Sequence, residues 1–190
     1  MTICVSNVGY KTKGGHLTSP DTQTNWNGIT GRIELIGYKN AHAENVMLWC
    51  DIHSKTVRVT ANITGGKSGK AVISAESFNS EKSHTPEVQS FEYTDGKLDA
   101  LYKMGNDCLL WSEHEPNLYK LRIDIDGDVS EHIIGMREFN TEGGKFTING
   151  EKTFLRGKHD GMIFPKTAFA PTDLDEWLRV MKISKSYGMN

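Results

Sequence analysis

Paired acids are the first residues of this chain whose types could do chemistry. Glu113 and Glu115 stand two positions apart in a polar turn that ends at Pro116. Two carboxyl groups can cleave a glycosidic bond when they flank it across a gap of about 5–9 Å. Acids that share a polar turn before a proline are usually solvated instead. We therefore predict no catalytic role for this pair.

A second acidic run, at residues 124–128, alternates as a calcium loop does. Helix–loop–helix calcium sites have their glycine sixth, whereas Gly127 is the fourth residue here and its flanks have the pattern of strands. Asp126-Gly127 is a favoured hairpin dipeptide, because both turn positions tolerate positive φ. The sequence therefore predicts a hairpin turn, and it indicates no metal site and no cofactor.

A polar cluster at residues 156–160 follows an apolar run and precedes a loop. Polar residues at the carboxyl end of a strand are typical of active sites in α/β barrels. His159 and Asp160 could both hydrogen-bond to sugar hydroxyls from that position. The alternative is that they only stabilise the loop after the strand.

Tryptophans and cysteines are expected mainly in the interior. Trp49 and Trp111 offer rings on which a sugar could stack, but a tryptophan in a β-sandwich more often belongs to the core. The three cysteines, Cys4, Cys50 and Cys108, form no Cys-x-x-Cys pair and are odd in number. We expect buried free thiols, since the spacing selects no disulfide.

Apolar and polar residues alternate with a period of two in several segments, and this pattern predicts the β-strands that must position these residues. Short strands at regular spacing, with turn signals between them, indicate an antiparallel β-sandwich over about residues 39–138. The clearest strand is 119–125, where apolar and charged residues alternate without a break. The other predicted strands are 56–63, 71–75, 88–93 and 129–136.

The C-terminal part has a different pattern. Residues 145–148 and 153–156 flank Asn149-Gly150, a second hairpin signal. A helix follows, with Thr172 as its predicted N-cap and Gly188 as its stop. Its apolar residues fall on one stripe: Leu174, Trp177, Leu178 and Met181. A strand, a loop and an amphipathic helix are typical of the first unit of an α/β fold, which needs partners to cover it.

Composition and the N-terminal stretch add fewer constraints. A net charge of −2 with no dense Lys/Arg cluster argues against nucleic acid as a partner. No apolar run approaches the ~20 residues that cross a bilayer, so no membrane partner is expected, and no signal peptide is visible. Alternation of Ile29, Ile33 and Leu35 predicts one or two strands there.

Four segments, in this order, together resemble the glycoside hydrolases of family 2, the class of β-galactosidases, β-glucuronidases and β-mannosidases. They are residues 24–31, Trp111 with 115–121, 135–137, and 146–152 with 155–157. The resemblance implies a jelly-roll tail at 1–38 and an immunoglobulin-like sandwich at 39–138. It implies the first strand and helix of a (β/α)8 catalytic barrel at 139–190.

The same resemblance implies a function. It suggests retaining cleavage of β-linked glycosides, as in β-galactosidases, by two glutamates on later barrel strands. Neither is carried over, because no Asn-Glu pair occurs here in a barrel context, so this fragment is expected to be inactive alone. His159 and Asp160 are expected to line the sugar pocket, although the family's usual spacing after Arg-Gly is two residues longer.

The expected partners are a carbohydrate substrate and the remaining domains of a longer enzyme, with a homo-oligomer left open. The resemblance also implies a periplasmic or extracellular location. A different class of function stays open beside it: a non-catalytic β-sandwich module that binds carbohydrate or another protein domain.

Overall fold

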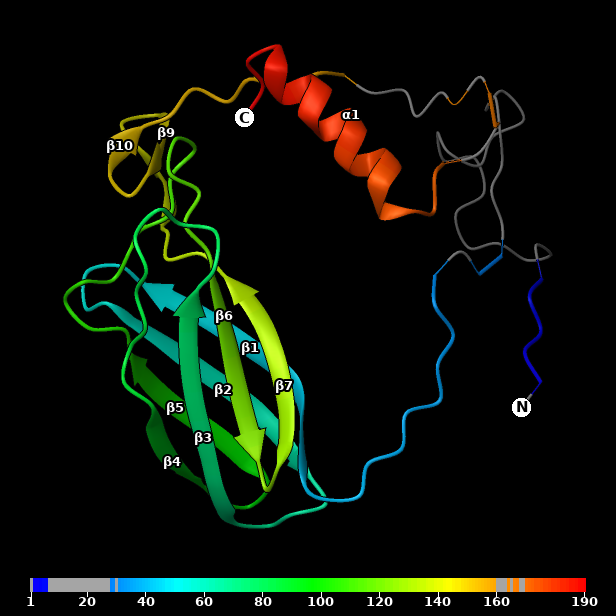
Figure 1. Cartoon of the computed structure of the whole chain (residues 1–190), viewed down its shortest axis with the longest axis vertical. Helices are drawn as coiled ribbons and strands as arrows, with labels where there is room; N and C mark the ends of the chain where they lie inside the picture. Colours follow the sequence, from blue (N-terminus) through cyan, green and yellow to red (C-terminus); the bar gives the residue numbers. More distant parts are fainter. Residues whose placement is uncertain (1, 7–27, 30, 160–163, 165, 168–169) are drawn as a thin grey trace. The chain divides into compact units, whose positions relative to one another are not determined.

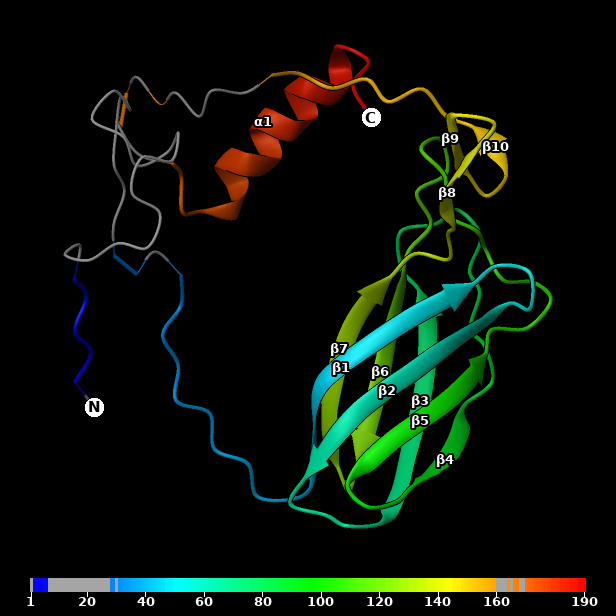
Figure 2. The same ribbon diagram turned by 180° about the vertical axis from the view of Figure 1, so that it is seen from behind.

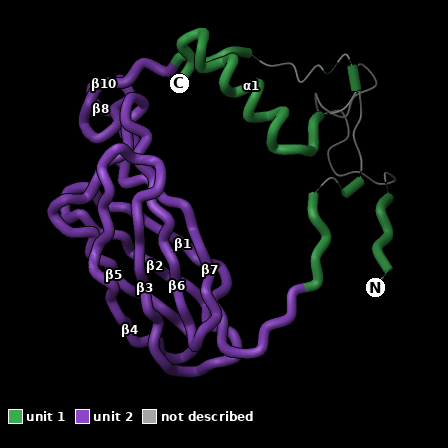
Figure 3. Tube along the Cα trace, viewed as in Figure 1, with its two compact units in different colours: residues 1–35, 156–190 green, residues 36–155 purple. Residues whose placement is uncertain are grey.

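The computed structural model describes residues 2–6, 28–29, 31–159, 164, 166–167 and 170–190. Two compact units divide the chain, one of residues 36–155 and the other of residues 1–35 with 156–190 (Figure 3). Asp160 and most of the 24–31 segment lie outside the described residues. Residues 31–38 contain no strand, and Leu35 is 98% exposed, so the strand predicted there is wrong for these residues.

Seven antiparallel strands of residues 36–155 form the predicted immunoglobulin-like sandwich (Figures 1 and 2). One sheet has the order β1-β2-β5, and the other has the order β4-β3-β6-β7. Their bounds are β1 His42–Asp51, β2 Thr56–Thr64, β3 Gly69–Ser77, β4 Gln89–Tyr93, β5 Lys97–Lys103, β6 Tyr119–Ile125 and β7 Asp128–Ile134. The Asp126-Gly127 turn joins β6 to β7 with φ angles of 51° and 86°, which confirms the predicted hairpin.

The core lies between the two sheets, where the alternating apolar residues of each strand point inward. Val57 and Val59 of β2 and Ile123 of β6 have no exposed surface. Each such side chain contributes roughly 1.5–3 kcal/mol through burial. Tyr102 and Tyr119 are fully buried as well, and each phenol has a hydrogen-bond partner. The sandwich therefore has a hydrophobic core of its own.

A β-bulge in β1 explains why this strand was not predicted. Glu44 pairs with Asn62 and Met47 pairs with Thr60, so Asn45 and Val46 stand opposite one residue of β2. Asn45 takes a φ of 52°, a conformation that asparagine tolerates better than most residues. The extra residue breaks the period of two on which the prediction of strands relied.

The prediction that Trp49 belongs to the core is wrong. Beyond the bulge, Leu48 and Cys50 point inward, and Trp49 lies on the outer face with 48% of its surface exposed. Of the three cysteines, all free, Cys108 is buried and Cys50 is half-buried, whereas Cys4 is exposed, contrary to expectation.

A small third sheet, β10-β9-β8, follows the sandwich. It consists of β8 Phe139–Glu142, β9 Lys145–Ile148 and β10 Glu151–Lys152, and Asn149-Gly150 forms the predicted hairpin between β9 and β10. The strand expected at 153–156 is not formed. Phe154 is 78% exposed there, and a barrel strand would need neighbours on both sides to become regular.

The predicted helix is present as α1, Leu174–Ser186. Its N-cap is Asp173 rather than Thr172, because the Asp173 carboxylate accepts the N–H of Glu176 at 2.9 Å. Gly188 follows the helix with a φ of 82°, as expected of a C-terminal stop. Most of the apolar stripe is uncovered among the described residues: Leu174 is 71% exposed, whereas Trp177 contacts the Phe164 ring edge to face.

Candidate functional site

The residues predicted to bind sugar are not assembled into a site by the described part of the chain. His159 is exposed and lies in a segment without regular secondary structure. Asp160 falls outside the described residues. The strand end on which their proposed role rested is missing from residues 153–156. Their role in sugar binding therefore stays a prediction.

Four residues quoted for the family resemblance do meet, at one end of the sandwich. This loop-end junction consists of Trp111, Gly135, Arg137 and Asn149. The Arg137 guanidinium lies 4.7 Å from the centre of the Trp111 ring, a cation–π contact. A methyl group on Gly135 would lie 3.2 Å from three atoms of Trp111, so a larger residue there would displace the indole by a few tenths of an ångström. Trp111 is partly buried, so it is neither a core residue nor a fully exposed ring on which a sugar could stack.

Asn149 fastens the small sheet to this junction. Its side-chain N–H donates to the Trp111 carbonyl at 2.8 Å, and its side-chain oxygen accepts the Glu138 N–H at 2.9 Å. Its own backbone N–H donates to the Glu138 carbonyl at 2.9 Å. With a φ of 53°, Asn149 serves both as the hairpin residue and as the anchor of the hairpin.

Tyr119, the last residue of the Pro-Asn-Leu-Tyr segment, fixes two loops at the same end. Its hydroxyl accepts the Leu109 N–H at 2.8 Å and lies 2.8 Å from Nδ1 of His84. Which of the two groups donates depends on the tautomer of the His84 ring, and the Cys108 thiol is a second hydrogen-bond neighbour of the Tyr119 hydroxyl. Burial lowers the pKa of His84 and raises the pKa of Tyr119, so both groups stay neutral near pH 7.

Two clefts open beside these loops. One, of about 710 Å³, lies between the loops that contain Asn79 and Asn117, and Glu81 and Glu115 contribute to its lining. The other, of about 720 Å³, includes Glu87 and Asp107 together with His84. The first cleft is mainly polar, whereas polar and apolar groups line the second in equal measure.

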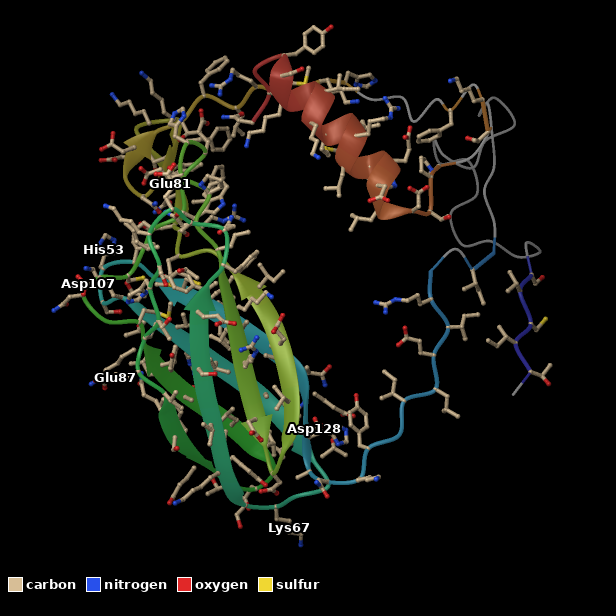
Figure 4. The ribbon with its side chains drawn as sticks, viewed as in Figure 1. His53, Lys67, Glu81, Glu87, Asp107 and Asp128 are labelled. Carbon is tan, nitrogen blue, oxygen red and sulfur yellow. The ribbon has the colours of Figure 1, made fainter. Side chains whose placement is uncertain are left out.

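The acids around the clefts do not form a catalytic pair. Figure 4 shows Glu81, Glu87 and Asp107 on separate segments, with their side chains apart from one another. An acid catalyst at neutral pH needs a raised carboxyl pKa. Hydrogen bonds lower the carboxyl pKa values of Asp51, Asp99 and Glu176, which is the opposite of what an acid catalyst needs.

Other chemistry is equally absent from the described residues. Burial raises the pKa of Cys50 to about 11, so its thiol is protonated and unreactive at neutral pH. The ranges given above contain no group of three or more His, Cys, Asp or Glu residues that could hold a metal ion. No helix in the described part is long and apolar enough to span a membrane. The loop-end junction positions the small sheet at the end of the sandwich.

Comparison with known proteins agrees with this geometry. The chain is 24% identical to a β-galactosidase of Leuconostoc mesenteroides subsp. mesenteroides, over 90% of this chain and 18% of that protein. Two solved β-glucuronidases share the fold. That of Parabacteroides merdae has a TM-score of 0.56 at 20% identity, and β-glucuronidase 3 of Bacteroides uniformis has 0.52 at 24%. Each match covers 80% of this chain and 20% and 19% of those chains.

A family model adds the decisive match. The model described as Glycosyl hydrolases family 2 matches residues 41–137, slightly more than half of the 190 residues. This range covers all seven strands of the sandwich and ends at Arg137 of the loop-end junction. The chain, which spans about a fifth of the length of these relatives, therefore belongs to the family 2 glycosyl hydrolases.

Proposed function

We propose that this chain is part of a retaining glycoside hydrolase that cleaves β-linked galactosides, and that it contains neither of the two catalytic glutamates. The match to the family over residues 41–137 carries the proposal. The relative named β-galactosidase, which aligns with 90% of the chain, favours galactosides among the family's substrates.

The proposal assigns three segments of the chain to the three domains of the family's architecture. Residues 1–38 are the end of a jelly roll, residues 39–138 are the sandwich, and residues 139–190 begin a catalytic barrel. The sandwich is a rigid spacer, and the loop-end junction holds the hairpin at the start of the barrel segment. The mostly uncovered apolar stripe of α1 supports this division, because the first helix of a barrel packs against later units.

Two assays test this function. The 190-residue chain is incubated with 4-nitrophenyl β-galactoside, and no turnover is expected. Turnover that is lost on substituting one of its own glutamates by glutamine would refute the proposal. If the reading frame continues past Asn190, the longer product is assayed with β-galactoside, β-glucuronide and β-mannoside, and the galactoside should have the highest kcat/KM.

The same longer product tests His159. A residue that binds the terminal sugar contributes to substrate affinity, so His159→Ala should raise KM at least tenfold. Lys158→Ala, one position earlier, is the matched control and should leave KM within twofold. Equal effects of the two variants would count against a role for His159 in binding.

A further inference from the structure

The outer face of the β1-β2-β5 sheet carries a compact group of side chains that the proposed function does not use. The register places Trp49, Arg58 and Leu101 side by side in one row and Met47, Thr60 and Asp99 in the next. Figure 2 shows the three strands that carry them. We call these six residues the outer platform. Met47, Trp49 and Leu101 are each about half exposed. A Trp ring so exposed on the edge strand β1 is the first sign of a binding surface.

The ring of Trp49 is held in place by a charged neighbour. The Arg58 guanidinium lies 5.8 Å from the ring centre, within the range of a cation–π contact. This contact restricts the side-chain rotamers, so less conformational entropy is lost when a ligand binds. The face of an indole ring is electron-rich, and the C–H groups on the flat face of a pyranose carry the complementary partial charge.

Arg58 and Asp99 supply polar groups beside the ring. The carboxylate accepts Nε of Arg58 at 2.9 Å and Nη2 at 2.7 Å, a bidentate pair. Two of the five guanidinium donors are used, and each carboxylate oxygen has acceptor capacity left. Both side chains are more than half exposed. A fixed donor beside a fixed acceptor matches two neighbouring hydroxyl groups of a sugar, each of which both donates and accepts.

The dimensions of the outer platform favour a sugar over a protein partner. Three strands and two rows span about 10 Å by about 7 Å, whereas a stable protein interface buries about 800 Å² on each partner. The centre of such an interface is depleted in charge, and burying the Arg58–Asp99 pair there would cost desolvation energy. Sugar hydroxyls can replace water around that pair.

We propose that the outer platform is a non-catalytic binding site for a β-linked oligosaccharide. Trp49 stacks on the face of one pyranose ring, and Arg58 and Asp99 hydrogen-bond to adjacent hydroxyl groups. Such a site would keep a glycan-degrading enzyme on its polymer between cleavage events. Binding here does not depend on hydrolysis, so this proposal and the proposed function can fail separately.

Affinity electrophoresis of the 190-residue chain tests the site. Gels contain soluble β-(1→4)-galactan or, for comparison, the α-linked glucan dextran. Retardation is expected in galactan only, and Trp49→Ala should weaken the binding at least tenfold. Arg58→Gln should weaken it about fivefold. Ile133→Ala, on the outer face of the other sheet, is the matched control and should bind as the wild type does.

The outcomes that overturn the proposal are equally definite. They are a wild type that is not retarded by galactan, a Trp49→Ala variant that binds normally, or equal retardation in dextran. Sedimentation that shows self-association lost in Trp49→Ala would assign the face to a protein partner instead. Circular dichroism confirms that each variant is folded, and Trp49→Phe, which keeps an aromatic face, should retain part of the binding.

Discussion

The strands of each of the two sheets together carry three exposed large hydrophobic residues on the outer face, but the residue types differ. The β1-β2-β5 face presents Met47, Trp49 and Leu101, and the β4-β3-β6-β7 face presents three β-branched residues: Val72, Val129 and Ile133. Valine and isoleucine are good strand formers whose exposure on a sheet needs no ligand to explain it. A half-exposed tryptophan adds a large flat ring, which a strand does not require.

Their charged groups differ as well. On the four-stranded face, Arg122 bonds to Glu131 and Glu76 at 3.0 Å each, and Lys120 lies 4.0 Å from Glu131. These groups satisfy one another across three strands. On the three-stranded face, Arg58 and Asp99 form one pair with unused donors and acceptors. We infer from this difference that the four-stranded face is a solvated surface, whereas the three-stranded face has the composition of a binding surface.

The largest expected effect is the loss of stability when a core leucine is truncated. It tests whether the two sheets, which differ on their outer faces, contribute equally to the core. Leu98 of β5 and Leu121 of β6 are inward-facing leucines, one from each sheet, and both are at most 2% exposed. Truncating either to alanine leaves a cavity, so each variant should lose about 2–5 kcal/mol of unfolding free energy. Urea denaturation followed by circular dichroism measures both. Losses that differ by more than about twofold would show that the sheets do not share one core equally.

A smaller loss of stability is expected when the loop that connects the two sheets loses a hydrogen bond. The loop from β5 to β6 crosses from one sheet to the other, and the Tyr119 hydroxyl holds it through the Leu109 N–H. Tyr119→Phe leaves that buried N–H without its acceptor and should cost about 1–3 kcal/mol. Amide hydrogen exchange should speed up first at Leu109. Unchanged exchange at Leu109 would mean that other contacts hold the loop.

The two sheets should lose stability in different pH ranges, because different titratable groups lie on them. His84 and His132, on the four-stranded side, have pKa values lowered by burial below the ordinary 6.5. Their neutral forms are favoured in the folded state, so stability is complete above pH 6.5 and falls as the pH drops through the folded pKa. Asp99, on the three-stranded face, has a pKa lowered by its hydrogen bonds to Arg58. Its contribution persists to lower pH and is lost only below the ordinary carboxyl pKa of 3.8.

Urea midpoints measured between pH 3 and pH 8 check this order. In His84→Asn the amide group can replace Nδ1 as the hydrogen-bond partner of Tyr119, and the decline between pH 6.5 and pH 5 should become shallower. Asp99→Asn should change the curve only near and below pH 4. A steeper decline of His84→Asn above pH 5 would contradict the assignment.

Sequence alone predicted the strands whose alternation is unbroken. In β6 every second residue is buried, and the predicted and observed bounds coincide. The bulge at Asn45 concealed β1, and with it the outward position of Trp49, because a single extra residue exchanges inner and outer positions. The strand β5 had a usable signal in the buried residues Leu98, Ala100 and Tyr102, which alternate cleanly.

The candidate site was harder to predict than the fold. Trp111, Gly135 and Asn149 were singled out as separate motifs, and no local pattern indicates that they meet. Their contact depends on where loops of different lengths leave the sheets, which is a tertiary property. The pairing of Arg58 with Asp99 is of the same kind, because it joins residues 41 positions apart through the β2–β5 register.

The smallest effect concerns the ion pairs that distinguish the outer faces. Exposed ion pairs contribute little and are screened by salt, so Arg122→Ala and Arg58→Ala should each lower the unfolding midpoint only slightly at low ionic strength. Arg122 bonds to two carboxylates and Arg58 to one, so Arg122→Ala should have the larger effect. In 1 M NaCl both differences from the wild type should nearly vanish. If Arg58→Ala were the more destabilising variant, the Arg58–Asp99 pair would be needed for the fold itself, and its exposure would no longer favour a role in binding.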